Sequence, residues 1–258
     1  MTDVVRPVVL HDRYKPNTTA TRQHHIALCT LNAKYIHSSL GLRYLLANLG
    51  DLQTNATLQE YTINQRPIDI AEAILESRPT IIGFGVYIWN IDQTTEVMSL
   101  IKVLAPEVVM VIGGPEVSHE YENTEVFRLC NHLITGQADH AFRECCESLV
   151  GGMSALPKVI EATTPAPLLL SAPYDFYNNE DIKNRILYVE ASRGCPFKCE
   201  FCLSALDKTA TPFDLAQFLA DMDKLYQRGA RQFKFVDRTF NLKVKSCIAI
   251  LEFFLERL

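Results

Sequence analysis

The fold class of this chain is decided by one apolar run, Ile81-Ile82-Gly83-Phe84-Gly85-Val86-Tyr87. Side chains alternate between the two faces of a strand, so a run that is apolar at every position predicts a strand buried on both faces. Strands of this kind lie at the centre of parallel sheets, where helices cover both faces. The run therefore predicts an α/β fold built on a parallel sheet.

The chain around this run alternates between strand and helix from residue 24 to residue 150. Short apolar runs predict four further strands, and segments with helical spacing and capping residues predict helices between them. The predicted strands cover 25–31, 57–63, 108–112 and 132–135, and the predicted helices cover 38–49, 68–77, 93–104 and 141–150. Five strands with intervening helices predict an open, doubly wound sheet of the Rossmann or flavodoxin type.

Ligands of doubly wound sheets bind beyond the carboxyl ends of the strands. The predicted binding positions are therefore the loops at 32–39, 87–90, 113–118 and 136–139. Gly113 and Gly114 would let the backbone approach a large planar ligand, although a tight turn explains paired glycines equally well. Tyr87 and Trp89 would line the apolar face of such a ligand, or else pack inside the protein, as aromatic residues after a central strand more often do.

The sequence changes character after residue 150. Residues 151–185 contain several prolines and a turn-rich aromatic stretch, and they are predicted to form a linker without regular elements. Beyond it, strands at 186–190 and 232–237 alternate with helices at 213–228 and 243–258, as in two βα units of a barrel. The predicted organisation is a polar segment over 1–23, a sheet domain over 24–150, a linker over 151–185 and part of a barrel over 186–258.

Three cysteines stand within eight residues, at Cys195, Cys199 and Cys202. Thiolates are the usual ligands of iron–sulfur clusters, and three of them leave one iron of a four-iron cluster open to a substrate. A structural zinc site usually needs four ligands, and the chain has no second Cys-x-x-Cys pair. A disulfide would close only a very small loop. The remaining cysteines are interpreted as small buried hydrophobic residues: Cys29, Cys130, Cys145, Cys146 and Cys247.

This cysteine spacing, with Phe201 directly before the last cysteine, resembles the signature of radical S-adenosylmethionine (radical SAM) enzymes. The resemblance implies that the three cysteines hold a 4Fe-4S cluster whose open iron binds the amino and carboxylate groups of S-adenosylmethionine. Reduction of the cluster, by a reductase such as flavodoxin or ferredoxin, would cleave the sulfonium and yield a 5′-deoxyadenosyl radical. Asp237 is expected to hold the amino group of the cofactor's methionine, unless it caps a helix or forms an ion pair.

The sheet domain is similar to the cobalamin-binding domain that precedes the barrel in one large branch of radical SAM enzymes. The segments that carry the likeness, to an uncharacterised group of that branch, are 30–39, 86–90 and 112–118. The resemblance implies that cobalamin is a cofactor and that the residues contacting it are Asn32, Tyr87, Trp89, Gly113 and Gly114.

Two loops depart from the pattern of cobalamin domains. Domains of the methionine-synthase kind carry Asp-x-His-x-x-Gly after the first strand, with the His as the lower ligand of cobalt. Here residues 35–41 read Tyr-Ile-His-Ser-Ser-Leu-Gly, so the Asp is absent and the Gly is one place late. Without an orienting carboxylate, His37 is expected to be a loop residue rather than a cobalt ligand. The second departure is Thr-Gly-Gln-Ala-Asp at 135–139, where relatives usually have Gly-Glu-Gly-Glu.

Charge and hydrophobic pattern restrict the partners and the location. A net charge of −5 and a pI of about 5.8 argue against a surface that coats nucleic acid, which would be basic. The sequence shows no export signal and no apolar run long enough to cross a membrane. We therefore expect a cytoplasmic protein without a membrane or nucleic-acid partner, in a reducing compartment that suits free thiols.

The expected reaction is radical abstraction of a hydrogen from an unidentified substrate, small molecule or other, followed by methyl transfer from methylcobalamin or another radical modification. Two alternatives are a non-catalytic cobalamin-binding module with a vestigial cluster loop, and a transfer-RNA methylthiolating enzyme. The family's barrel has more βα units than the two found here, so the chain is expected to be a fragment. Its apolar last helix, around 248–255, is then expected to be uncovered and to promote association.

Overall fold

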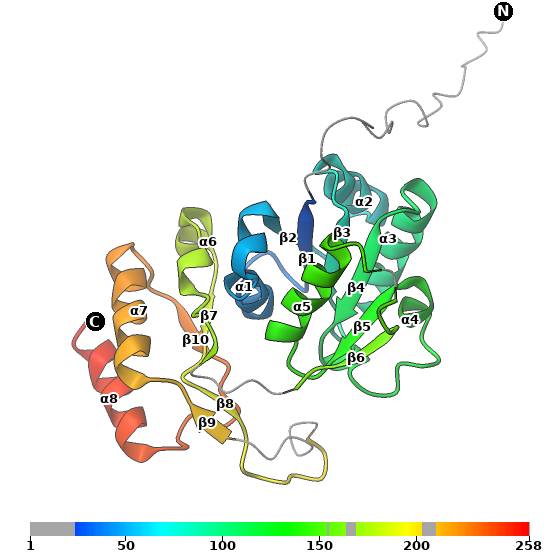
Figure 1. Cartoon of the computed structure of the whole chain (residues 1–258). Coiled ribbons are helices and arrows are strands. Elements are labelled where there is room, and N and C mark those ends of the chain that lie inside the picture. Colours follow the sequence, from blue (N-terminus) through cyan, green and yellow to red (C-terminus); the bar gives the residue numbers. More distant parts are fainter. Residues whose placement is uncertain (1–23, 154, 164–168, 203–209, 258) are drawn as a thin grey trace, which may run out of the picture.

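A computed structural model of the chain describes residues 24–153, 155–163, 169–202 and 210–257. The largest element is a six-stranded sheet with the order β2-β1-β3-β4-β5-β6, in which every neighbouring pair is parallel (Figure 1). The predicted parallel sheet is therefore confirmed. Its strands are β1 (Ile26–Asn32), β2 (Ala56–Thr62), β3 (Ile81–Gly85), β4 (Val109–Gly113), β5 (His132–Thr135) and β6 (Val159–Glu161).

Helices cover both faces of the sheet, because each strand presents apolar side chains on both sides. On one face, Leu28 and Ile134 pack with α1 (Leu40–Ala47) and α5 (Asp139–Val150). On the other face, Leu31 and Phe84 pack with residues of α2 (Pro67–Glu76), α3 (Ile91–Leu104) and α4 (Glu125–Leu129). The two layers of helices lie on opposite sides of the sheet (Figure 1). Short 3-10 turns cover Gly50–Asn55, Pro115–Val117 and Tyr174–Phe176.

The strand order places a switch point between β1 and β3. The chain goes from β1 outward to β2 on one side, and then returns to β3 on the other side of β1. Loops that leave two such strands run in opposite directions, and the crevice between them is where open α/β sheets bind ligands. Asn32 ends β1 and Tyr87 follows β3, so both residues lie at this crevice.

The second unit contains two parallel strands, β7 (Leu187–Val189) and β10 (Phe233–Phe235), connected through helix α7 (Leu215–Gln227). Helix α8 (Val244–Leu255) follows β10. Residues Phe218 and Met222 of α7 pack against β7, and Ile250 joins them from α8. The two predicted βα units are therefore present, together with an antiparallel pair that was not predicted, β8 (Ser192–Gly194) and β9 (Ala210–Pro212).

The prediction that residues 151–185 contain no regular element is wrong. Strand β6 lies in this segment and pairs with β5, so it extends the sheet. Helix α6 (Asn179–Asn184) also lies there, and its N-cap is Asn178, which exchanges hydrogen bonds with Asp181. Tyr177 is fully buried, and its hydroxyl donates to the carbonyl of Tyr188. The segment therefore packs against both units.

Four apolar side chains of helix α8 are exposed. Ile250 is its only buried residue, whereas four others are at least half-exposed or close to it: Val244, Ile248, Leu251 and Leu255. One face of this helix is thus exposed, and association through it stays a prediction. In the part of the chain that the structure describes, no helix combines the length and the hydropathy needed to cross a membrane.

Candidate functional site

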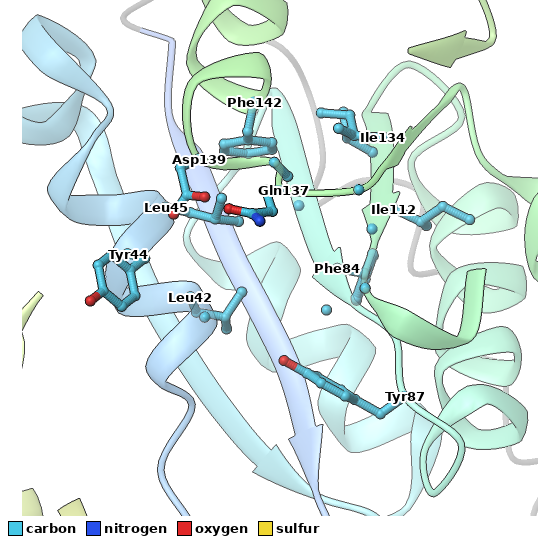
Figure 2. A pocket seen from close by; sticks show the side chains of 18 of the residues that line it. Leu42, Tyr44, Leu45, Phe84, Tyr87, Ile112, Ile134, Gln137, Asp139 and Phe142 are labelled. Atoms are coloured by element: carbon cyan, nitrogen blue, oxygen red, sulfur yellow. The ribbon is translucent and has the colours of Figure 1, made fainter. Parts of the chain in front are cut away.

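A cavity of about 210 Å³ lies at the carboxyl edge of the sheet, between β3, β4 and β5 on one side and α1 and α5 on the other (Figure 2). In Figure 2, Tyr87 lies at one end of this cavity and Phe142 at the other. Six of the eleven glycines of the chain line it: Gly41, Gly83, Gly85, Gly113, Gly114 and Gly136. We call it the glycine-lined cavity.

A side chain would have a different effect at each of three glycines that line this cavity. A Cβ atom at Gly83 would lie 2.8 Å from the ring of Phe142, so the ring would have to move. Gly114 has a φ of 123°, and a Cβ there would overlap the carbonyl oxygen of Val86. Gly85 is different, because its nearest neighbour would be Thr30 Oγ1 at an ordinary 3.4 Å. The backbone requires glycine at Gly114, whereas a Cβ atom at Gly85 would make only ordinary contacts.

A second cavity, of about 460 Å³, adjoins the first and is called the interdomain cavity. It lies between the loops after β1 and β3 and the second unit, which contributes Tyr188, Glu190 and Val236. The two cavities share four lining residues: Gly41, Tyr44, Tyr87 and Arg193. A ligand larger than either cavity could therefore extend from one into the other.

Tyr87 and Trp89 line the interdomain cavity as a stacked pair. Their ring centroids are 4.5 Å apart, and the ring planes differ by 8°. The buried side chain of Asn90 fixes this loop, because its oxygen accepts from the amide of Tyr87 and its amide donates to the carbonyl of Leu31. Burial raises the pKa of Tyr87, so its hydroxyl stays protonated. The pair thus presents a flat aromatic surface at the crevice.

Asn32 also borders the interdomain cavity, but its amide hydrogens are engaged by the protein. The amide nitrogen donates to Glu60 Oε1 and to the carbonyl of His37, both at 3.0 Å. These contacts hold the loop after β1 in place. The structure therefore gives Asn32 a structural role, and its predicted contact with cobalamin stays a prediction.

His37 lies in the loop between β1 and α1, as expected, and lines the interdomain cavity. Its Nδ1 is 2.7 Å from the hydroxyl of Tyr188 on β7. Burial, and then the charges of Lys234 and Lys34, lower the pKa of His37. The imidazole is therefore neutral at neutral pH, and it connects the sheet domain to the second unit.

The three clustered cysteines lie in the loop that follows β8. Cys195 and Cys202 are partly exposed, Cys199 is exposed and Phe201 is 94% exposed. Cys195 Sγ lies 3.2 Å from the hydroxyl of Thr239, and the amide of Cys202 donates to the carbonyl of Cys199. None of the eight cysteines, all of which fall in described segments, forms a disulfide.

Among the residues the structure describes, no three acidic, histidine or cysteine side chains converge on one metal ion. A four-iron cluster takes each thiolate at a different iron, so its ligands do not have to meet at one point. The loop carries three accessible thiols on a short segment, and thiols are the donors that such a cluster uses.

The other cysteines differ from these three in burial. Burial raises the pKa of Cys130 and of Cys145 to about 11 in each case, and it raises the pKa of Cys29 and Cys146 as well. Thiols of this kind are protonated and unreactive at neutral pH. The interpretation as buried hydrophobic residues is confirmed for these four, whereas Cys247 is only partly buried.

Asp237, the predicted contact of the methionine amino group, lies just after β10. Its carboxylate accepts from the backbone amide of Ala191 at 3.0 and 3.1 Å and from the hydroxyl of Ser192 at 2.6 Å. These bonds connect the end of β10 to the junction of β7 and β8. The carboxylate thus positions the chain that leads into the cysteine loop, and its contact with a ligand stays a prediction.

Arg193, which was not among the predicted site residues, lines both cavities. Its guanidinium donates to Asp139 Oδ2 at 2.9 Å and to Glu190 Oε1 at 2.7 Å, and it lies 4.6 Å from the ring centroid of Tyr44. Burial lowers the pKa of Arg193, but the two carboxylates raise it by more, so the net shift is upward and the guanidinium stays charged. The sequence shows that Arg193 stands two residues before Cys195, which could have marked it as a site residue. The sequence does not show that Asp139 is its partner.

Part of the chain matches a known protein family. Residues 26–146 match the family model described as "B12 binding domain". Strands β1 to β5 and the loops after β1 and β3 fall inside the match, whereas β6 and the cysteine loop fall outside it. A solved structure of a cobalamin-binding protein from Desulfitobacterium hafniense is 21% identical, with a TM-score of 0.37, and covers 49% of this chain and 58% of that chain.

Three curated relatives are named methyltransferases. An uncharacterized methyltransferase of Pyrococcus horikoshii, PH0819, is 25% identical over 237 residues, which cover 82% of this chain and 51% of the relative. The cobalamin-dependent radical SAM methyltransferase TokK of Streptomyces tokunonensis is 28% identical and covers 52% of this chain and 23% of the relative. The 2-(S-pantetheinyl)-carbapenam-3-carboxylate methyltransferase of Streptantibioticus cattleyicolor is 28% identical, and the aligned residues cover 54% of this chain and 24% of the relative. The chain thus spans about half the length of the first relative and about a quarter of the other two.

Proposed function

We propose that this chain binds cobalamin at the carboxyl edge of its sheet and takes part in methyl transfer by radical SAM chemistry. The observation that carries the proposal is the glycine-lined cavity, which gathers six of eleven glycines at the carboxyl edge of the sheet. All of its lining residues except Arg193 lie inside the segment that matches the B12-binding family model. Three relatives named as methyltransferases support the reaction class.

The lining of the two cavities suits the two parts of cobalamin. The flat nucleotide base of the cofactor needs a narrow apolar slot, and the glycine-lined cavity offers backbone at Gly85 and Gly113 with apolar walls from Leu42 and Ile112. The broad corrin ring needs a wider apolar surface, which the stacked rings of Tyr87 and Trp89 offer in the interdomain cavity. Bound cobalamin would supply a transferable methyl group.

The cysteine loop suits a 4Fe-4S cluster and S-adenosylmethionine. Cys195, Cys199 and Cys202 would each bind one iron, and the cluster, once reduced, would cleave S-adenosylmethionine to give the 5′-deoxyadenosyl radical. Asp237 would fix the start of this loop through Ala191 and Ser192. Phe201, which is exposed, would cover the adenosyl part of the cofactor. Arg193, which lines both cavities, stands two residues before Cys195 in the sequence.

Reconstitution under strictly anaerobic conditions tests the proposal. The purified chain is incubated with iron, sulfide and hydroxocobalamin, passed through gel filtration, and mixed with S-adenosylmethionine and a strong reductant. We expect cobalamin to elute with the protein, cluster absorption in the visible spectrum, and formation of 5′-deoxyadenosine. Protein that retains no cobalamin contradicts the proposal. Protein that retains cobalamin but releases no 5′-deoxyadenosine is a non-catalytic binding module.

A further inference from the structure

We infer that Arg193 is a positioning residue that couples the glycine-lined cavity to the cysteine loop, so that a ligand in the cavity fixes the position of Cys195. The inference rests on the proposed function, because it takes cobalamin as the ligand of the cavity. It adds a residue and a connection that neither the B12-binding match nor the cysteine spacing contains. Arg193 does not touch the reacting atoms in this account and acts through the two elements that it joins.

The first anchor of Arg193 lies on the sheet domain. Nη1 donates to Asp139 Oδ2 at 2.9 Å and to Gln137 Oε1 at 3.3 Å. Asp139 is the first residue of α5, its side chain is 7% exposed, and both acceptors line the glycine-lined cavity (Figure 2). A hydrogen-bonded charge pair with so little exposure is held much more firmly than a surface pair. The guanidinium is therefore attached to the wall of the cavity.

The second anchor lies on the segment that leads into the cysteines. Arg193 is the middle residue of β8, and Nε and Nη2 both donate to Glu190 Oε1, at 3.1 and 2.7 Å. The backbone of β8 pairs with β9, where Arg193 faces Thr211. Only Gly194 separates Arg193 from Cys195. A shift of the guanidinium therefore moves the backbone that carries the first cluster ligand.

Aromatic rings fix the plane of the guanidinium. It lies 4.6 Å from the ring centroid of Tyr44 on α1 and 5.8 Å from that of Phe213. The planar fork of an arginine can lie on a ring and bind two carboxylates at once, whereas the ammonium of a lysine is a point charge on a flexible chain. The position therefore needs arginine itself and not just a positive charge.

Together these contacts form a continuous connection from the cavity wall, through Asp139 and Arg193, to Cys195. A ligand that packs against the wall restricts Asp139 and Gln137, and the restriction passes to the cysteine loop. Coupling between two sites is reciprocal, so an ordered cysteine loop should in turn strengthen ligand binding.

Thiol labelling of the full chain without its cluster tests this inference. The rate of alkylation of Cys195 by iodoacetamide is followed by peptide mass spectrometry, with and without saturating cyanocobalamin, whose cobalt already carries a cyanide ligand. We expect cyanocobalamin to slow labelling of Cys195 by about fivefold or more, the lower end of typical coupling between sites. In Arg193→Lys we expect the slowing to fall below about twofold while the charge is retained. Equilibrium dialysis measures how much cyanocobalamin each protein binds.

Controls within the same chain separate coupling from unfolding. The buried thiols of Cys29 and Cys146 should stay unlabelled in every variant that folds. Arg257→Lys is the matched control, because Arg257 also binds a carboxylate, Asp223, and lies 3.6 Å from the ring centroid of Phe253, but it belongs to neither cavity. We expect it to leave the slowing unchanged. Asp139→Asn, which breaks the charge pair with little change of shape, should act as Arg193→Lys does.

Each outcome decides between the two proposals. Wild-type chain that binds no cyanocobalamin refutes the proposed function. Wild-type chain that binds it without any slowing at Cys195 refutes the coupling alone, as does full slowing in Arg193→Lys with ligand bound. If Arg193→Lys binds no cyanocobalamin, the alkylation rate of Cys195 without ligand is compared between this variant and the wild type. A faster rate in the variant supports the role of Arg193 in holding the cysteine loop, and an unchanged rate refutes it.

Discussion

Arg43 of helix α1 donates to Asp181 of helix α6 at 2.8 Å, across 138 residues of sequence. The same nitrogen, Nη2, also donates to Glu60 Oε2 on β2 at 2.8 Å, and Arg185 binds that oxygen at 2.9 Å. The side chains of Arg43, Glu60 and Asp181 are at most 4% exposed. This network joins the sheet domain to the 151–185 segment beside the interdomain cavity, because Glu60 also holds Asn32, which lines that cavity.

Replacement of Arg43 by methionine is expected to destabilise the fold strongly. The change leaves the carboxylates of Glu60 and Asp181 buried with less compensation, and removal of one partner of a buried ion pair costs about 3–5 kcal/mol. Urea unfolding followed by circular dichroism measures the loss. The control is Arg66→Met, whose partner Asp69 and whose own side chain are exposed. Similar losses in both variants would contradict the importance of the buried network.

Acid should weaken the same network. Burial raises the pKa of Glu60, but Arg43 and the other donors outweigh it, and the net shift is downward. The unfolded chain therefore binds a proton at a higher pH than the folded chain does, so the stability from Glu60 is complete above its ordinary pKa of about 4.3 and is lost as the pH falls through the lowered value. Unfolding free energies measured between neutral and acid pH should fall less steeply in Glu60→Gln than in the wild type. Equal slopes in this acid range would show that Glu60 does not titrate as described.

The central part of the fold was readable from the sequence because each element carries its own pattern. The apolar run at 81–87 contains β3, and the predicted strand at 132–135 coincides with β5. Strand β6 and the β8–β9 pair escaped prediction because each has three residues and does not stand in a longer apolar run, as the equally short β7 and β10 do. Their strand character comes from the neighbours with which they pair, and that information is not local.

Those parts of the site that are marked by one residue type could be predicted from the sequence. Closely spaced cysteines and paired glycines are visible in one sequence, and so are aromatic residues after a central strand. The pair of Arg193 and Asp139 is not, because 54 residues separate its members and only the fold brings them together. For the same reason the hydrogen bonds of Asn32 and Asp237 to protein atoms could not be foreseen.

Removal of a single loop cysteine should abolish the cluster. Cys199→Ala leaves two thiolates for a cluster that the loop would otherwise hold at three irons. After anaerobic reconstitution we expect bound iron and visible absorption to fall to the background level. Cys145→Ala is the matched control, because the thiol of Cys145 is buried with a raised pKa and lies in α5. A cluster that survives in Cys199→Ala would contradict the assignment of the loop.

Trp89 offers a direct optical signal, because it is the only tryptophan of the chain and it lines the interdomain cavity. A cobalamin that occupies this cavity should quench its fluorescence, since the corrin would lie against the half-exposed indole. Titration with cyanocobalamin measures the quenching, and free N-acetyltryptophanamide at the same absorbance corrects for light absorbed by the ligand. Binding without quenching beyond that correction would place the cofactor away from Trp89.

The most direct measurement of the central claim is the affinity for cobalamin of two variants at one position, Gly85→Ala and Gly85→Leu. A Cβ at Gly85 has ordinary neighbours at 3.4 Å or more, so alanine fits, whereas the larger side chain of leucine would fill the glycine-lined cavity. Equilibrium dialysis with cyanocobalamin should give Gly85→Ala an affinity close to that of the wild type. We expect Gly85→Leu, with circular dichroism of a folded protein, to bind at least about tenfold more weakly, a difference of about 1.4 kcal/mol. Folded Gly85→Leu with unchanged affinity would contradict the location of the cofactor in this cavity.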